Sequence, residues 1–572
     1  MKRSQQFVAS RLAHGPGAWR LLMVAALMVV ARQTTADPPT RIANQARLDV
    51  LAESAVGELR DFRLAVGDGD AQRMDWIDKA QQSGSITASF TIWPFGWREF
   101  ELRFTPARSG SVDLQLLGPW QSLEQQTVKQ EVLWDAIQVA GAKMANGSFE
   151  QTTLDAEQGW KSQGGTIVEA NSQIPAVDGK YYGRTWHDGR LTTTLRVTGG
   201  QQLRVRGFAR AVFPAGFVEM RRIESRDTAA HRAAQKFRRG INLANDLEVP
   251  PGQDWGARHT AEDLEFIRQE GFDHVRIPIG WHHFTGPAPD YLIRDSMFGK
   301  ADFLIQNASQ RGLNVIINIH HFDAFTSNPS RERSRFLAIW RQLAERYAAT
   351  GSGVAFELLN EPKDAATTEI LNEIYAETIL LIRRKNPTRT IFVGPGKWNA
   401  VAELSKLRLP DDETNVIVTV HSYMPMNFTH QGTSWTGPDY SLTGVQFPGP
   451  PETPLRVPPL LRLRPQVLTW ISRYNTLPTD ENPAGEKALV VHLQQAQQWS
   501  EYYGRPVHLG EFGVIDKADA ASRSRYCRAV RLQTEAAGIG WALWDWKAPF
   551  RYWDKSLQRP MPGMREALFG KP

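Results

Sequence analysis

The chain has 572 residues, of which 41% are hydrophobic and 22% charged, and it contains 19 Trp and one Cys. This length exceeds one ordinary domain and predicts two or three. The formal net charge of +6 is small for this size, and no long Lys/Arg run with interleaved aromatic residues occurs, which argues against a nucleic-acid partner. A single cysteine excludes an intrachain disulfide. We expect Cys527 to be a buried, unreactive thiol within a helix at 522–537.

The N-terminus has the pattern of an export signal. Four basic residues precede an apolar run at 21–31, and small residues follow at 34–36. This predicts a signal peptide over 1–36 that is cleaved near Asp37, and therefore a secreted, periplasmic or cell-surface protein. The run is too short to span a bilayer comfortably, so we expect no stable membrane insertion after cleavage, although an uncleaved anchor is an alternative.

Two β-rich segments follow, at 37–145 and 146–220. Both contain short alternating strands separated by Gly, Pro and Ser, such as 99–104 and 191–197, which is β-sandwich patterning. The second segment opens with the sequence at 146–150 and holds a later Trp186, and it loosely resembles jelly-roll carbohydrate-binding modules. We therefore expect one or two β-sandwich domains, which either bind sugar or are purely structural.

A basic connector at 221–239 is expected to be a solvated helix or linker. From Gly240 onward, strands alternate with helices, and this pattern predicts a parallel sheet. One helix begins at Thr260, with Asp263 completing a capping box, and stops at Gly271. Eight expected strands predict a (β/α)8 barrel over 240–572, with a long sixth loop at about 425–483; they are 240–243, 273–278, 314–321, 354–361, 390–394, 416–423, 505–511 and 539–544.

Two of these strands end on a glutamate. Glu361 follows Asn360 and precedes Pro362, and Glu511 stands between glycines. The carboxyl ends of barrel strands carry the catalytic groups of such folds. A pair of carboxylates is what glycoside hydrolysis needs, because one protonates the leaving oxygen while the other attacks the anomeric carbon or activates water. For a retaining enzyme, the two carboxyl groups should lie ~5–5.5 Å apart.

The other strand ends also carry groups that titrate, hydrogen-bond or stack, where a purely structural barrel would have aliphatic residues. We expect Arg276 to hold Glu511 ionised, and Asn360 to contact a sugar 2-hydroxyl. His421 and Tyr423 should orient the carboxylates by hydrogen bonds, and the Trp544 indole should lie beneath the sugar ring. Adjacent strand residues point to opposite faces, so one of two neighbouring histidines should face inward unless the strand ends there. No metal-ligand spacing such as HExxH occurs, so we expect no metal. The strand-end residues that we expect to contact the substrate or the two glutamates are Arg276, His320, His321, Asn360, His421, Tyr423 and Trp544.

These motifs resemble glycoside hydrolase family five, the cellulase-type (β/α)8 barrels with glutamates on strands four and seven. The stretch 428–432 followed by Trp435 is similar to a loop of some bacterial members. The resemblance implies retaining, cofactor-free cleavage of a β-linked polysaccharide, with Glu361 as acid/base and Glu511 as nucleophile. An endo-β-1,4-glucanase acting as a monomer is favoured. Open alternatives are a β-mannanase, a xyloglucanase, an exo-β-1,3-glucanase, a hydrolase that trims a glucan made by the same cell, and a non-catalytic carbohydrate-binding surface protein.

Overall fold

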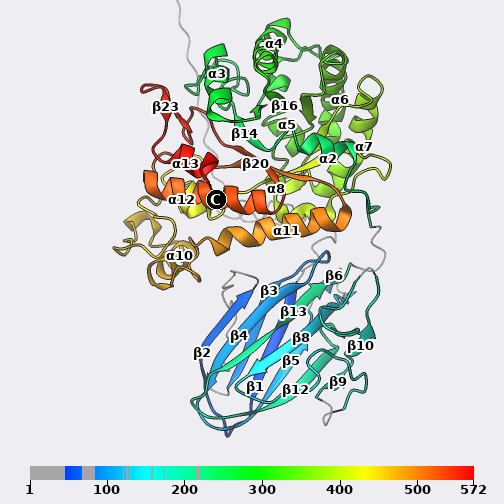
Figure 1. The fold of residues 1–572 in the computed structure, drawn as a ribbon, viewed down its shortest axis with the longest axis vertical. Coiled ribbons are helices and arrows are strands. Elements are labelled where there is room, and N and C mark those ends of the chain that lie inside the picture. The colour runs from blue at the N-terminus through cyan, green and yellow to red at the C-terminus, as the bar shows by residue number, and fades with distance from the viewer. Residues whose placement is uncertain are drawn as a thin grey trace, which may run out of the picture.

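The computed structural model describes residues 45–66, 84–119, 122–123, 126–127, 129–155, 159–172, 174–213 and 219–571. They form an N-terminal β-sandwich and a C-terminal (β/α)8 barrel, and the long helix α11 (Lys487–Tyr503) lies between them (Figure 1). The expected signal peptide at 1–36 lies outside the described residues. None of the described helices has both the length and the apolar character needed to cross a membrane.

The N-terminal domain is one sandwich of two antiparallel sheets, with the strand orders β3-β1-β5-β12-β9 and β10-β11-β8-β13-β4-β2. The expected division into modules at 145/146 is therefore wrong, because strands from both segments share each sheet and pair directly, β5 with β12 and β4 with β13. The strands are β1 (Gln45–Ala52), β2 (Leu59–Val66), β3 (Ser85–Thr91), β4 (Arg98–Pro106), β5 (Gly110–Leu117), β8 (Val132–Ala140), β9 (Lys161–Gln163), β10 (Thr166–Glu169), β11 (Tyr181–Thr185), β12 (Arg190–Val197) and β13 (Leu203–Ala211), and a separate hairpin holds β6 (Ser122–Leu123) and β7 (Gln126–Thr127).

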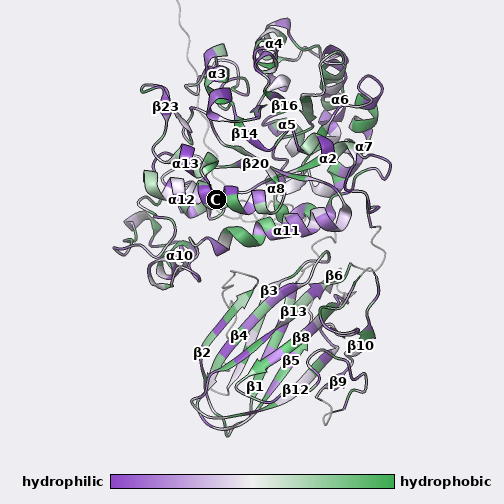
Figure 2. Cartoon of the chain, in the orientation of Figure 1, coloured by the Kyte–Doolittle hydropathy of each residue, from purple (hydrophilic) through white to green (hydrophobic). Residues whose placement is uncertain are grey.

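The sandwich is held by alternation of apolar and polar residues. In β4, Phe100, Leu102 and Phe104 are buried between the sheets, whereas the intervening Glu101 and Arg103 are partly exposed. Successive side chains of a strand point to opposite faces, so one side of each sheet meets the core and the other meets solvent. The alternation is visible as changing hydropathy along the strands (Figure 2).

The C-terminal domain is a closed barrel of eight parallel strands in chain order, as predicted. Each strand pairs with its sequence neighbours, and the last closes on the first. The strands are β14 (Arg239–Asn242), β15 (His274–Ile277), β16 (Asn314–Asn318), β17 (Val354–Glu357), β18 (Ile391–Val393), β19 (Val416–His421), β20 (Val507–Phe512) and β21 (Gly540–Leu543), and a small hairpin, β22 (Trp553–Asp554) and β23 (Arg559–Pro560), follows them.

The helices wrap the barrel, and two detailed predictions about them are confirmed. In α3 (Ala261–Glu270), Thr260 and Asp263 form the expected capping box and Gly271 ends the helix with φ 104°. Cys527 is buried in α12 (Ala520–Ala536), close to the predicted bounds. The sixth loop is partly helical. The remaining α-helices are α4 (Asp295–Gln310), α5 (Asp323–Ser327), α6 (Pro329–Arg346), α7 (Thr368–Arg383), α9 (Met426–Thr429), α10 (Pro465–Thr476) and α13 (Met564–Phe569), and the 3-10 helices are η3 (Trp281–Phe284), η4 (Val401–Lys406), η5 (Pro438–Tyr440) and η6 (Pro459–Leu461). The segment α8 (Gly396–Asn399) is a short turn with left-handed residues rather than a regular helix.

The basic connector expected at 221–239 is solvated only in part, since side chains such as Arg221 and Arg232 are exposed. It contains α2 (Ala229–Ala234), capped by Thr228, and its Ala230, Ala233 and Phe237 are buried. These side chains form an apolar cluster with inward-facing residues of four barrel strands, Ile316, Ala355, Phe392 and Ile417. The connector therefore plugs the amino end of the barrel with its apolar side chains, whose burial is favourable, while charged side chains such as Arg232 stay exposed.

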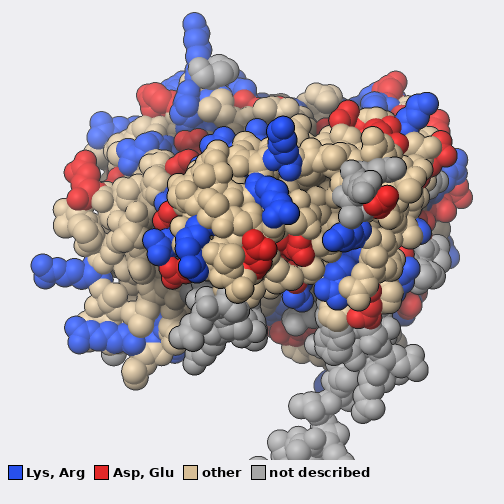
Figure 3. Space-filling view, turned by 90° about the horizontal axis from the view of Figure 1, so that it is seen from below, with Lys and Arg blue, Asp and Glu red and all other residues tan. Residues whose placement is uncertain are grey.

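The two domains touch along α11. Trp93 of the sandwich donates its indole N–H to Gln498, Arg210 lies over the ring of Tyr502 at 5.9 Å, and Phe213 packs against the same ring. Arg63 also pairs with Glu481 of the sixth loop at 2.5 Å. Seen from below, Lys/Arg and Asp/Glu side chains are interspersed over this face of the molecule (Figure 3).

Candidate active site

Arg276 organises the carboxyl end of the barrel. It is inaccessible to solvent and comes from β15. Its guanidinium donates to Glu357 through Nε and Nη2 (2.6 and 2.7 Å), to Glu511 through Nη1 (2.8 Å) and to the Asn360 side-chain oxygen through Nη2 (2.6 Å). Nη1 also donates to Asn242 Oδ1 at 2.8 Å. The expected contact between Arg276 and Glu511 is thus present, within a larger network.

Two members of this network were missed from the sequence. Glu357 ends β17 and lies two residues beyond the inward-facing Ala355, so strand alternation could have identified it as inward-facing. Asn242 ends β14, and its amide donates to the Gly510 carbonyl at 3.1 Å. Both residues fix Arg276, and Asn242 also ties the backbone beside Glu511.

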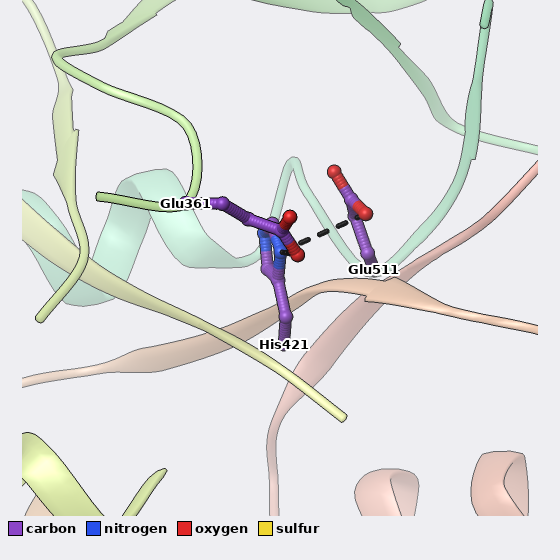
Figure 4. Close-up of side chains that lie close together, drawn as sticks. All are labelled: Glu361, His421 and Glu511. Carbon is purple, nitrogen blue, oxygen red and sulfur yellow. Dashed lines mark hydrogen bonds and ion pairs between the residues drawn. The ribbon is translucent and has the colours of Figure 1, made fainter. Parts of the chain in front are cut away.

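Glu361 and Glu511 lie close together, with His421 beside both carboxyl groups (Figure 4). One carboxylate oxygen of each glutamate and a ring nitrogen of His421 all lie within 4.8 Å of one another. His421 Nδ1 contacts Glu361 Oε1 at 2.9 Å and is 3.7 Å from Glu511 Oε2. Tyr423 donates its hydroxyl to Glu511 Oε2 at 2.9 Å. Glu511 thus receives one donor on each oxygen.

The electrostatic environment separates the two glutamates. Burial raises the pKa of Glu361 to about 7, and the charges of Arg276 and Lys363 only partly oppose this. Burial and the neighbouring Glu361 carboxyl raise the pKa of Glu511, whereas the charge of Arg276 and the hydrogen bond from the Tyr423 hydroxyl act in the opposite direction. Because donors hold both oxygens of Glu511, its carboxylate form is the better stabilised of the two. Burial lowers the pKa of His421 to about 4, so its ring is neutral near neutral pH.

The other predicted residues lie at the same carboxyl end of the barrel. Strand β16 ends at Asn318, so both histidines follow it: His320 is buried with its ring parallel to Trp544 (centroids 5.7 Å apart), whereas His321 is exposed. Trp544 follows β21 and is partly exposed. Asn360 Nδ2 is buried and has no hydrogen-bond partner among the described residues. Its oxygen is held by Arg276, so the amide N–H groups are free for a ligand.

The cluster of Glu361, His421 and Glu511 could by composition hold a metal ion, and no other such cluster is found among the described residues. However, its ligand atoms already have partners. Arg276 and Tyr423 donate to the oxygens of Glu511, and His421 contacts Glu361 through one nitrogen and Asn399 through the other. A guanidinium so close also repels a cation. The arrangement therefore suits acid–base chemistry better than metal binding.

Comparison with known proteins gives a consistent result. The family model "Cellulase (glycosyl hydrolase family 5)" matches residues 234–549, more than half of the chain. Endoglucanase H of Acetivibrio thermocellus is 27% identical over 311 residues, 54% of this chain and 30% of that protein, so the chain spans under a third of that relative. Endoglucanase C from the same organism is 28% identical over 54% of this chain and 91% of that protein.

Solved structures resemble the barrel. The endoglucanase Cel5A of Thermotoga maritima is 33% identical with a TM-score of 0.52, covering 59% of this chain and 99% of that one. The cellulose synthase subunit Z of Clostridioides difficile is 28% identical with a TM-score of 0.51, covering 58% and 99%. With the closed barrel and the match over 234–549, these findings establish that the chain belongs to glycosyl hydrolase family 5.

Proposed function

We propose that the protein is a retaining endo-β-1,4-glucanase in which Glu361 is the acid/base and Glu511 the nucleophile. The observation that carries this proposal is the short separation, within 4.8 Å, between oxygens of the two carboxyl groups. Retaining enzymes hold their carboxyl groups ~5–5.5 Å apart, whereas inverting enzymes leave ~6.5–9.5 Å for a water molecule. The separation is closer to the retaining range than to the inverting range, and this supports direct attack.

The roles follow from the contacts of each glutamate. Glu511, held as a carboxylate by Arg276 and Tyr423, attacks the anomeric carbon, while the protonated Glu361 gives its proton to the leaving oxygen. This step forms a covalent glycosyl–Glu511 ester and releases one end of the chain. The ester no longer carries a negative charge, so Glu361 loses a neighbouring anion and ionises more readily. It then takes a proton from water, which hydrolyses the ester.

Three other residues are suited to the sugar itself. Asn360 offers its unpartnered Nδ2 to the 2-hydroxyl, a contact that strengthens as the oxocarbenium-like transition state forms. Trp544, backed by the parallel ring of His320, offers an apolar face to the pyranose. His321 is exposed beside His320 and can hydrogen-bond to hydroxyls.

β-1,4-Glucan is favoured because the relatives are endoglucanases. β-Mannan is the second candidate, because Thermotoga maritima Cel5A has been solved both with cellobiose and with mannotriose. Export rests on the basic and apolar pattern at 1–36.

The test is reducing-sugar release by the mature protein on carboxymethyl-cellulose, β-mannan, xyloglucan and laminarin. Glu361→Ala and Glu511→Ala are compared with Glu345→Ala, which removes an exposed glutamate paired with Lys385 on the barrel surface. We expect release from carboxymethyl-cellulose, lost in the first two variants and retained in the third. Azide should restore turnover of an activated aryl cellobioside by Glu511→Ala. Binding without release on any polymer would favour a non-catalytic carbohydrate-binding protein instead.

A further inference from the structure

Asn399 lies behind His421, on the side of the ring opposite Glu361. It is inaccessible to solvent, and its Nδ2 contacts His421 Nε2 at 3.3 Å. An amide NH2 can only donate, so in this orientation of the amide, which leaves the buried Asn399 Oδ1 without a hydrogen-bond partner among the described residues, His421 Nε2 accepts the hydrogen bond and carries no proton. The ring is neutral, so its proton must then be on Nδ1, the nitrogen 2.9 Å from Glu361 Oε1.

The backbone around Asn399 is shaped to bring the amide there. Lys397, Trp398 and Asn399 have φ values of 52°, 61° and 54°. Three consecutive left-handed residues are unfavourable for L-amino acids, and Asn tolerates this region better than most. The turn is held where Trp398 N–H donates to the Pro362 carbonyl at 2.9 Å, and by an isolated bridge between Ala400 and His421.

A glycine makes room for the amide. A Cβ placed on Gly394 would lie 2.5 Å from Asn399 Cγ, and Gly394 does not have a left-handed φ. Alanine would therefore fit the backbone of position 394 but collide with the Asn399 side chain. Three features therefore meet at this place: Gly394, whose backbone conformation does not require glycine, the left-handed turn at 397–399, and the buried amide of Asn399.

We propose that Asn399 is a positioning residue that fixes His421 as the Nδ1–H tautomer, so that the ring donates to Glu361 and cannot accept its proton. This inference rests on the proposed function of Glu361. A ring protonated on Nε2 would present an unprotonated Nδ1 to Glu361. This nitrogen would accept a hydrogen bond from the protonated Glu361 carboxyl, so the proton would point towards the ring and not towards the leaving oxygen. With Nδ1–H in place, the Glu361 proton remains available to the substrate, and the ionised form of Glu361 gains a donor when it acts as base.

The charged and titratable groups around this pair come from several elements. Those near His421 or Glu361 are Arg276, His320, Glu357, Lys363, Tyr423, His508 and Glu511. None of them contacts His421 Nε2, whose hydrogen bond among the described residues is to Asn399. The tautomer is therefore decided at that contact.

The direct test does not depend on turnover. The full chain is labelled with nitrogen-15 histidine, and the His421 signals are assigned by loss in His421→Gln. We expect the Nδ1–H pattern in the unaltered protein. In Asn399→Asp the carboxylate accepts from Nε2, so the pattern should change to Nε2–H. An Nε2–H ring in the unaltered protein, or the same tautomer in both proteins, would overturn the inference.

The kinetic test separates acid catalysis from general damage. A phenyl cellobioside needs protonation of its leaving group, whereas a dinitrophenyl cellobioside does not. Because general acids contribute about 10²–10⁴-fold, partial misdirection of the proton should lower kcat/KM for the phenyl substrate about tenfold in Asn399→Gly, and less than twofold for the dinitrophenyl substrate. The basic limb of the pH profile should move to higher pH, because a bare Nδ1 favours protonated Glu361.

Two further variants complete this test. Gly394→Ala keeps the amide but displaces it, and should show the same unequal loss. Lys397→Gly alters the same turn at an exposed residue that pairs with Glu403, and should leave both substrates and the pH profile unchanged. Equal losses on both substrates in Asn399→Gly and Gly394→Ala would mean a merely structural role. If neither substrate is cleaved by the unaltered protein, the proposed function fails, and the tautomer measurement alone decides the inference.

Discussion

The interiors of the two domains differ in kind. Between the sheets of the sandwich lie apolar side chains such as Leu102 and Phe104. The carboxyl end of the barrel instead buries Arg276, Glu357 and Glu511 within one network. Buried charges cost free energy unless each is paired and hydrogen-bonded. The sandwich interior is thus explained by stability alone, whereas the barrel's polar end makes sense as a site prepared for charge that develops during a reaction.

The largest expected effect comes from removing the shared cation. In Arg276→Met, Glu357 and Glu511 lose their counter-charge and face each other as buried anions. We expect a stability loss of about 3–5 kcal/mol, typical of a broken buried ion pair, and a fall in kcat/KM of at least ~10²–10³-fold. Urea unfolding and aryl cellobioside turnover measure the two effects.

The matched control for this variant is Arg276→Met combined with Glu357→Gln. Removing one anion should recover much of the stability while activity stays low, because Glu511 still lacks its donor from Arg276. A single Arg276→Met variant as stable as the unaltered protein would mean that the network does not hold buried charge as described.

In the sandwich, a comparable stability loss should leave catalysis intact. Phe104 is inaccessible to solvent, and Phe→Ala in a core typically costs about 3–5 kcal/mol. Phe104→Ala should therefore lower stability by this amount without changing kcat/KM of the folded protein on a soluble substrate. Arg103→Ala, the neighbouring residue on the outer face, should cost less than ~1 kcal/mol. A large fall in kcat/KM in Phe104→Ala would show that the sandwich shapes the cleft.

The third prediction uses the pH dependence of Glu361. Its pKa is about 7 in the folded protein against 4.5 for an ordinary Glu, so the folded state binds the proton more tightly. Stability is then lost as pH rises from about 4.5 towards 7, because in this range the unfolded chain releases the proton while the folded protein still holds it. Glu361→Gln cannot lose that proton, and should be more stable than the unaltered protein by up to about 3 kcal/mol at pH 8 and by little at pH 4.

Urea unfolding of Glu361→Gln at both pH values measures this, with Glu345→Gln as the exposed control. Equal effects of Glu361→Gln at the two pH values would contradict the raised pKa.

The sequence allowed the barrel to be predicted better than the sandwich. Each barrel strand is a short, mostly apolar run, several carry a polar residue at or near their carboxyl end, as at His421 and Glu511, and each strand pairs with its neighbour in the chain, so local patterns suffice. The sandwich strands were also found by alternation, but β5 and β12 pair across a long stretch of intervening chain. The alternation of residues along a strand does not indicate which distant strand pairs with it. For this reason the sequence analysis divided one sandwich into two modules.

The candidate site shows the same division. Groups placed at strand ends, such as Arg276 and Tyr423, were identified from chemistry and position. Glu357 was overlooked because it precedes the more prominent Asn360 and Glu361, although alternation from Ala355 points it inward. Asn399 could not have been found, because its contact depends on a left-handed turn with no glycine at positions 397–399 to indicate it.

The smallest effect is expected where the two domains meet. Arg63 pairs with Glu481 at 2.5 Å, with side-chain exposures of 56% and 21%. Exposed ion pairs contribute about 0–1 kcal/mol, because water and salt screen them and both side chains lose conformational freedom. Arg63→Gln should thus shift the unfolding free energy by less than ~1 kcal/mol, no more than Arg60→Gln, whose pair with Glu58 lies within the sandwich. Since burial of apolar area dominates stability, the unfolding free energy of each domain should depend on its own interior and not on the contacts between the domains. A shift above ~2 kcal/mol confined to Arg63→Gln would mean instead that docking couples the apolar interior of one domain to the charged interior of the other.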